Sequence, residues 1–135
     1  MRLNIIQNVK IIVIEPDPMI REFVVDVLEF SVNRKVRSFE NGQDALNFLT
    51  SNGDADIIIS EADLPGTPGL NFLSIVKEKW PDRICILMSS DSNNEKAAEA
   101  LGLEACLSKP FGVKDLFAIV QKFVVESDRK KPPNV

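Results

Sequence analysis

Five short apolar runs rich in β-branched residues alternate along the chain with longer segments of helical periodicity. Within the runs the apolar residues are continuous rather than alternating, as in IIVI at residues 11–14 and IIIS at residues 57–60. Such runs indicate strands covered on both faces, which occur in parallel sheets between helices. The pattern therefore predicts a series of βαβ units and an α/β fold. The runs are Lys10–Ile14, Lys35–Phe39, Asp56–Ser60, Arg83–Met88 and Ala105–Leu107.

The segments between the runs carry start and stop signals for helices. Asp17-Pro18 supplies an N-cap acceptor followed by proline at the first helical position. Ser92 and Glu95 have the spacing of a capping box before a short alanine-rich segment. Elsewhere, apolar residues recur at helical spacing. Helices are predicted over residues 18–33, Gly42–Ser51, Leu70–Trp80, 93–102 and Val113–Val125.

Composition removes several classes of function. The 135 residues, 44% of them hydrophobic, are enough for one domain with one core, and no apolar run is long enough to cross a bilayer. The net charge of −4, with both signs mixed along the chain, disfavours direct nucleic-acid binding. The chain contains no histidine, which excludes zinc-hydrolase motifs and Ser-His-Asp catalysis. We expect a cytoplasmic domain that is not an enzyme and does not contact membranes.

The two cysteines, Cys85 and Cys106, lie inside apolar segments. This placement predicts buried, reduced thiols rather than a disulfide or a metal site.

Polar residues follow four of the predicted strands. In an open parallel sheet, ligands bind beyond the C-terminal ends of the strands, near the point where the strand order reverses. Carboxylate oxygens can hold a hard cation such as magnesium, while lysine and serine can stabilise phosphate oxygens. The set therefore favours a site for a cation and a phosphoryl group. Its members are Glu15, Pro16, Asp17, Glu61, Ala62, Asp63, Ser89, Ser90, Ser108, Lys109 and Pro110.

Each of these residues also has an ordinary structural interpretation. Asp17 can be an N-cap that needs no ligand, and Asp63 precedes a Leu-Pro-Gly turn. Ser89 can satisfy backbone groups where its strand ends, and Lys109 alone would be a solvated surface lysine. The signal is the combination at four strand ends.

At these positions the sequence resembles the receiver domain of bacterial response regulators, over about Lys10 to Val125. The matching pieces are IIVIEPDPMIR, NGQDAL, DIIISEADLPGTPG, ILMSS and LSKPF. The resemblance implies a flavodoxin-like (βα)5 three-layer sandwich with the parallel strand order 2-1-3-4-5. Residues 1–126 would form the receiver-like domain, and the polar, proline-bearing residues 127–135 a tail or linker.

The resemblance also implies roles for individual residues. Family members use an aspartate nucleophile after strand three, a magnesium-binding acidic pair after strand one, a hydroxyl after strand four and a lysine after strand five. By position these roles fall on Glu61, on Glu15 and Pro16, on Ser89 and on Lys109, with a cis peptide bond before Pro110.

Three positions depart from the family pattern. Glu61 adds one methylene to the acceptor, which moves its carboxylate outward by about 1.5 Å, and misplacement of that order can cost about a hundredfold in rate. Pro16 offers no side-chain oxygen, so magnesium is expected to bind weakly or not at all at Glu15, Glu61 and Asp63. Cys106 stands where the family carries an aromatic switch residue, which leaves only Ser89 of the usual switch pair.

These departures favour a pseudo-receiver: a protein-interaction module in which Glu61 pairs with Lys109 as a phosphate mimic would. Its contact face would be helix four, strand five and helix five, where Ala97, Ala98 and Ala100 permit close approach or simply pack the helix. The expected partners are a histidine kinase, an output domain or another signalling protein, with self-association through the last helix as a further expectation. The alternatives are a receiver that accepts phosphate from a histidine kinase on Glu61 or Asp63, and a small hydrolase or transferase.

Overall fold

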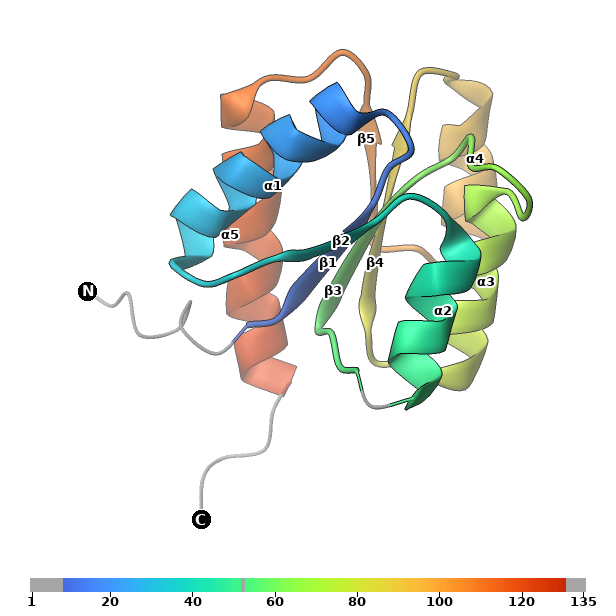
Figure 1. Ribbon diagram of the computed structural model, residues 1–135, viewed down its shortest axis with the longest axis horizontal. Coiled ribbons are helices and arrows are strands. Elements are labelled where there is room, and N and C mark those ends of the chain that lie inside the picture. The colour runs from blue at the N-terminus through green and yellow to red at the C-terminus, as the bar shows by residue number, and fades with distance from the viewer. Residues whose placement is uncertain (1–8, 52, 131–135) are drawn as a thin grey trace.

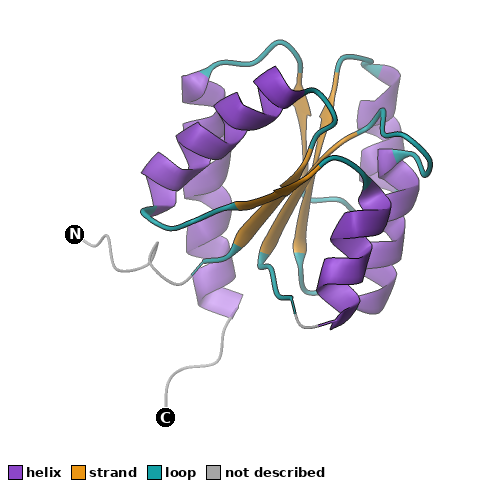
Figure 2. Cartoon of the chain, in the orientation of Figure 1, coloured by secondary structure: helices purple, strands orange, loops and turns teal. Residues whose placement is uncertain are grey.

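The computed structural model describes residues 9–51 and 53–130, with side chains as far as Val124. Five strands form one parallel sheet in the order β2-β1-β3-β4-β5. The flavodoxin-like order and the three layers are as predicted (Figures 1 and 2). The elements are β1 Ile11–Ile14, α1 Pro18–Val32, β2 Arg37–Phe39, α2 Gly42–Ser51, β3 Ile57–Glu61, α3 Gly69–Lys79, β4 Ile84–Ser89, α4 Asn93–Ala100, β5 Ala105–Ser108 and α5 Val113–Lys130.

The central strands β1, β3 and β4 are buried on both faces, as their continuous apolar runs predict, whereas the edge strand β2 is largely exposed. Ile11 and Val13 of β1 point into a core shared with α1 and α5, whereas Ile12 and Ile14 point into a second core shared with α2, α3 and α4. Because successive strand side chains point to opposite faces, one four-residue strand serves both cores. In Figure 1, α1 and α5 cover one face of the sheet and the other three helices cover the opposite face.

The first helix begins and ends as the sequence predicts. The carboxylate of Asp17 accepts hydrogen bonds from the backbone N–H groups of Met19 and Ile20, at 2.9 and 3.4 Å. Asn33 closes the helix in the left-handed conformation, with φ of 55°. Asparagine tolerates this conformation better than most residues.

The last helix ends later than predicted, and α4 begins where predicted but lacks the predicted capping bond. Ser92 is the N-cap residue of α4 but makes no side-chain capping bond; the carboxylate of Asp91 instead accepts from the Asn93 N–H at 2.9 Å. The last helix continues to Lys130, five residues beyond the predicted end at Val125. The polar sequence after Val125 begins with residue types that favour helix, such as Glu126, Arg129 and Lys130. Of the predicted tail, residues 131–135 lie outside the described part of the chain.

Phe72 and Phe30 provide a matched test of this core. Phe72 is fully buried in the second core, whereas Phe30 is 81% exposed on α1. We expect Phe72→Ala to lower the free energy of unfolding by about 3–5 kcal/mol, through lost burial and the cavity left behind. Phe30→Ala should change it by less than about 1 kcal/mol, because most of the ring is already in contact with solvent. Urea denaturation of both variants measures the difference, and equal losses would contradict this packing.

Candidate functional site

The predicted site residues converge at the C-terminal edge of the sheet. Glu15 follows β1, Glu61 ends β3, Ser89 ends β4 and Lys109 follows β5. Because the strands are parallel, their carboxyl ends meet at one edge. The polar residues Glu15, Glu61 and Ser89 are buried there, and Lys109 is half-buried.

The Lys109 ammonium lies between two buried carboxylates. Its Nζ is 3.0 Å from Glu15 Oε1 and is also in contact with Glu61 Oε1. The Glu15 and Glu61 side chains are only 2% and 6% exposed. The sequence-based expectation of a Glu61–Lys109 pair therefore has its counterpart in the structure. Glu15 joins the same pair, which the sequence reasoning did not include.

Backbone amides hold the remaining oxygens of the two carboxylates. Glu15 Oε2 accepts from the Asp17 N–H at 3.1 Å, and Glu61 Oε2 accepts from the Asp63 N–H at 2.7 Å. Each of the four carboxylate oxygens thus faces a nitrogen donor or the ammonium. Together, Lys109 and the two amides supply the positive charge and hydrogen bonds that buried carboxylates require.

The environment of Lys109 favours its charged form. Burial lowers the pKa of the lysine. The hydrogen bonds that its ammonium donates to Glu61 and Glu15, together with the charges of both carboxylates, outweigh burial, so the pKa is raised above its ordinary value. The lysine therefore stays protonated beside its partners throughout the neutral range.

The site residues do not fit the magnesium ion that the resemblance implies. Magnesium requires near-octahedral oxygen coordination, and in the described residues no three acidic or cysteine side chains are grouped to hold a metal. The structure does not gather Glu15, Glu61 and Asp63 into one cluster, because the Asp63 side chain is exposed and its backbone faces Glu61. Pro16 offers no side-chain oxygen. The Lys109 ammonium already provides a positive charge between the two glutamates.

The resemblance assigns Ser89 and Cys106 to the switch pair, and the structure places them at the end of β4 and within β5. The Ser89 hydroxyl accepts from the Asp91 N–H at 3.0 Å and from the Asn94 side-chain amide at 2.8 Å, so it organises the loop into α4. Cys106 is half-buried on β5 rather than buried, while Cys85 is buried as predicted; both are free thiols. Burial, followed by the charge of Glu95, raises the pKa of Cys106. The peptide bond between Lys109 and Pro110 is cis, as the resemblance implied.

Three contributors to the site escaped the sequence reasoning. Arg21 donates from Nη1 to the carbonyl oxygens of Glu15 and Pro16, at 2.8 and 3.3 Å, and fixes the loop after β1. Asn94 binds the Ser89 hydroxyl. A Cβ atom at Gly69 would overlap the Glu61 carbonyl oxygen, so glycine lets α3 approach the end of β3. The signals available were an arginine one turn after the N-cap and a glycine eight residues after Glu61.

The parallel five-stranded sheet with a lysine and carboxylates at its strand ends defines a flavodoxin-like α/β domain. Comparison with known families makes this specific, because the sequence model of the response regulator receiver domain matches residues 11–121. The chain belongs to this family, the receiver domains of two-component response regulators. No described helix is both long and apolar enough to cross a membrane.

Individual relatives agree with the family assignment. The chain is 31% identical over 113 residues to the DNA-binding transcriptional regulator NtrC of Proteus hauseri, covering 80% of this chain and 24% of that protein. The response regulator DrrB of Thermotoga maritima is 26% identical, with a TM-score of 0.77 over 87% of this chain and 53% of that one. The response regulatory domain of mrkE from Klebsiella pneumoniae shares the fold, at 18% identity and a TM-score of 0.83, with 90% of this chain and 99% of that one covered. The chain spans less than a quarter of the length of the NtrC proteins it matches.

Removal of the Lys109 charge should destabilise the domain strongly. We expect Lys109→Met to lower the free energy of unfolding by about 3–5 kcal/mol at neutral pH, because it leaves two buried carboxylates without a cation. Chemical denaturation at neutral pH measures the loss. Lys114→Met, on the exposed face of α5, is the matched control and should be near neutral; a similarly small effect for Lys109→Met would contradict the proposed charge balance.

The raised pKa of Lys109 predicts a specific loss of stability in alkali. In the unfolded chain this lysine loses its proton near its ordinary pKa of 10.5, whereas the folded protein retains it to higher pH. Its stabilisation is therefore complete below that value and is lost as the pH rises through the folded pKa. In chemical denaturation from about pH 9 upward, the free energy of unfolding should fall more steeply with pH for the wild type than for Lys109→Met. The Cys85 thiol, whose pKa burial raises to about 12, contributes equally to both proteins. Parallel plots of unfolding free energy against pH would therefore contradict the raised pKa of Lys109.

Proposed function

We propose that this domain is a pseudo-receiver, a non-catalytic protein-interaction module of cytoplasmic two-component signalling that does not take up phosphate by the usual aspartyl mechanism. The observation that carries the proposal is the engagement of Glu61. One carboxylate oxygen contacts the Lys109 ammonium and the other accepts from the Asp63 N–H. In-line attack on a phosphoryl donor needs an aligned, free oxygen. Here both oxygens are engaged, and the side chain is 6% exposed.

The metal-binding half of the usual chemistry is weakened as well. Phosphoryl transfer relies on a metal ion to neutralise charge on the transferred group. Pro16 removes one side-chain ligand, and Lys109 pairs with both glutamates that could supply others. The contacts of Lys109 with Glu15 and Glu61 would keep the charge at the C-terminal edge of the sheet constant. A constant charge suits a domain that signals by binding rather than by a phosphorylation cycle.

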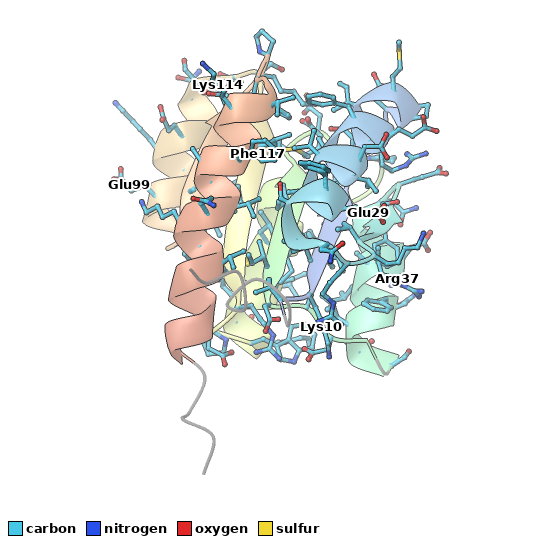
Figure 3. The ribbon with its side chains drawn as sticks, turned by 90° about the vertical axis from the view of Figure 1, so that its left-hand side faces the viewer. Lys10, Glu29, Arg37, Glu99, Lys114 and Phe117 are labelled. Carbon is cyan, nitrogen blue, oxygen red and sulfur yellow. The ribbon has the colours of Figure 1, made fainter. Side chains whose placement is uncertain are left out.

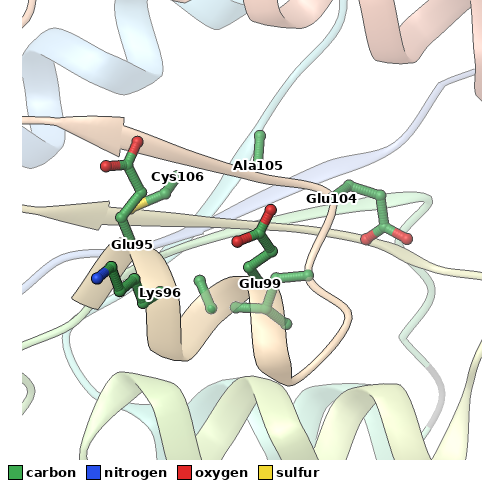
Figure 4. Close-up of a pocket in the computed structure, with 8 residues that line it drawn as sticks. Glu95, Lys96, Glu99, Glu104, Ala105 and Cys106 are labelled. Carbon is green, nitrogen blue, oxygen red and sulfur yellow. The ribbon is translucent and has the colours of Figure 1, made fainter. Parts of the chain in front are cut away.

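The face formed by α4, β5 and α5 is the proposed surface for a signalling partner. A hollow of about 330 Å³ lies between α4 and β5, with Ala98, Leu103 and Cys106 in its wall. Figure 4 shows Glu95 and Glu99 on α4 directed toward β5, with Cys106 beside Glu95. The small cysteine leaves this hollow open where the family carries an aromatic side chain. Contact at this face would therefore be independent of any rotamer change at position 106.

Helix α1 offers a second contact surface. Met19 and Phe30 are 79% and 81% exposed, and Phe23 lies on the same stripe at helical spacing. Contiguous exposed apolar side chains commonly mark interaction sites. The Phe30 ring lies with its centroid 6.4 Å from that of Phe117 on α5, and Figure 3 shows Phe117 on the part of α5 that lies beside α1. This arrangement supports a binding function, and self-association through α5 stays a prediction.

Exposure to a small phosphodonor distinguishes the proposed function from the alternative, a receiver phosphorylated on Glu61 or Asp63. After incubation with acetyl phosphate and magnesium, intact mass spectrometry should find no phosphoryl adduct on the wild type. Titration with beryllofluoride and magnesium should leave the amide NMR spectrum unchanged. A labile adduct that Glu61→Gln or Asp63→Asn abolishes would establish the alternative.

The double variant Pro16→Asp/Glu61→Asp is the positive control. It restores an acidic pair after β1 and a shorter acceptor on β3 while leaving Ser89 and Lys109 in place. We expect this variant to acquire the adduct and to respond to beryllofluoride. If neither protein reacts, the block lies elsewhere in the site, and the assignment of the loss to these two residues is wrong.

A further inference from the structure

A hollow of about 370 Å³ lies at the end of the sheet opposite the strand-end site. We call it the cationic hollow. It opens beside the start of β1 and the edge strand β2, and Figure 3 shows Lys10 and Arg37 toward the end of the molecule away from Lys114. Its lining residues are Lys10, Ile11, Ile12, Arg34, Lys35, Arg37, Phe48, Gly53 and Asp54.

The lining is strongly positive although the whole chain carries a net charge of −4. Arg34 has an interaction of its own, and the other three basic side chains, Lys10, Lys35 and Arg37, still outnumber the one acidic side chain of the lining, Asp54. The Asp54 carboxylate is shared, because it lies 3.6 Å from the Lys10 ammonium and 3.3 Å from the guanidinium of Arg83, which is not part of the lining. The hollow therefore keeps a surplus of positive charge. A concave surface of one sign concentrates counter-ions more strongly than a flat one.

Arg37 is held in place by an aromatic ring. Its guanidinium carbon lies 4.7 Å from the centroid of the Phe48 ring, at cation–π distance. Phe48 in turn packs against Phe39 with ring centroids 5.4 Å apart. The cation is thus positioned before any ligand arrives, which reduces the entropy lost on binding. The planar guanidinium fork suits the paired oxygens of a phosphoryl group.

We propose that the cationic hollow binds a small phosphorylated anion carrying at least two negative charges. Arg37 and Lys35 would contact its phosphoryl oxygens and Lys10 would add to the attractive field, while Phe48 and Ile11 line the hollow beside the bound molecule. Charged residues on an edge strand also discourage strand pairing, but that role needs neither a hollow nor an arginine stacked on a ring. The proposal does not depend on the state of Glu61.

Calorimetric titration with inorganic pyrophosphate tests this proposal on the full chain. We expect saturable binding at one site in low salt, weakening as salt is added. Lys35→Gln/Arg37→Gln should bind about tenfold more weakly or worse, because two charge-assisted contacts are lost. Both residues are exposed, so circular dichroism should show an intact fold. Phe48→Leu, which keeps every charge but removes the ring beneath Arg37, should weaken binding by a smaller factor.

Lys114→Gln/Lys122→Gln is the matched control, since it removes the same charge from the exposed face of α5. It should bind pyrophosphate as the wild type does. Absence of saturable binding, or equal weakening in both double variants, would overturn the proposal. Co-sedimentation with phosphatidylglycerol vesicles in the absence of pyrophosphate binding would also overturn it, because the surface would then recognise a membrane.

Discussion

The charge balance at the C-terminal edge of the sheet depends on one ammonium group. A parallel sheet covered on both faces leaves its polar residues at the strand ends, and here two of them are carboxylates that the surrounding chain buries. Two such charges repel each other and lose their hydration, so they need a cation within contact distance. Lys109 supplies this cation from the end of the edge strand β5. Arg21, the Asp17 and Asp63 amides and the close approach at Gly69 then hold the glutamates around that charge.

The fold was predictable because its signals are local and agree with one another. The IIVI and IIIS runs predict buried parallel strands, and Asp17-Pro18 predicts the start of α1 within one residue of the observed element. The two errors have physical reasons. Ser92 has the right chemistry for a cap, but the neighbouring Asp91 reaches the orphan amide first. The polar residues after Val125 suggest a tail, but Glu, Arg and Lys are good helix formers and α5 continues to Lys130.

Only part of the site could be predicted. Strand order places Glu61, Glu15 and Lys109 at one edge, and the sequence therefore indicated their proximity. It could not show that Lys109 contacts both glutamates or that the Ser89 hydroxyl turns toward its own loop, because these outcomes depend on side-chain rotamers and loop geometry. Gly69 gave no signal of its role, since a close backbone approach appears only when α3 is placed against β3.

The contact between Lys109 and Glu15 joins residues 94 positions apart. Contacts of such separation form only after the intervening chain has been organised, because closing a long loop costs entropy before the contact rewards it. The glutamates of β1 and β3 therefore become fully stabilised only when the last strand joins the sheet. During synthesis, a chain that has emerged only as far as β4 would hold two adjacent carboxylates without their cation. Completion of β5 thus couples the electrostatics of the first strand to the arrival of the last, which makes assembly of the domain cooperative from end to end.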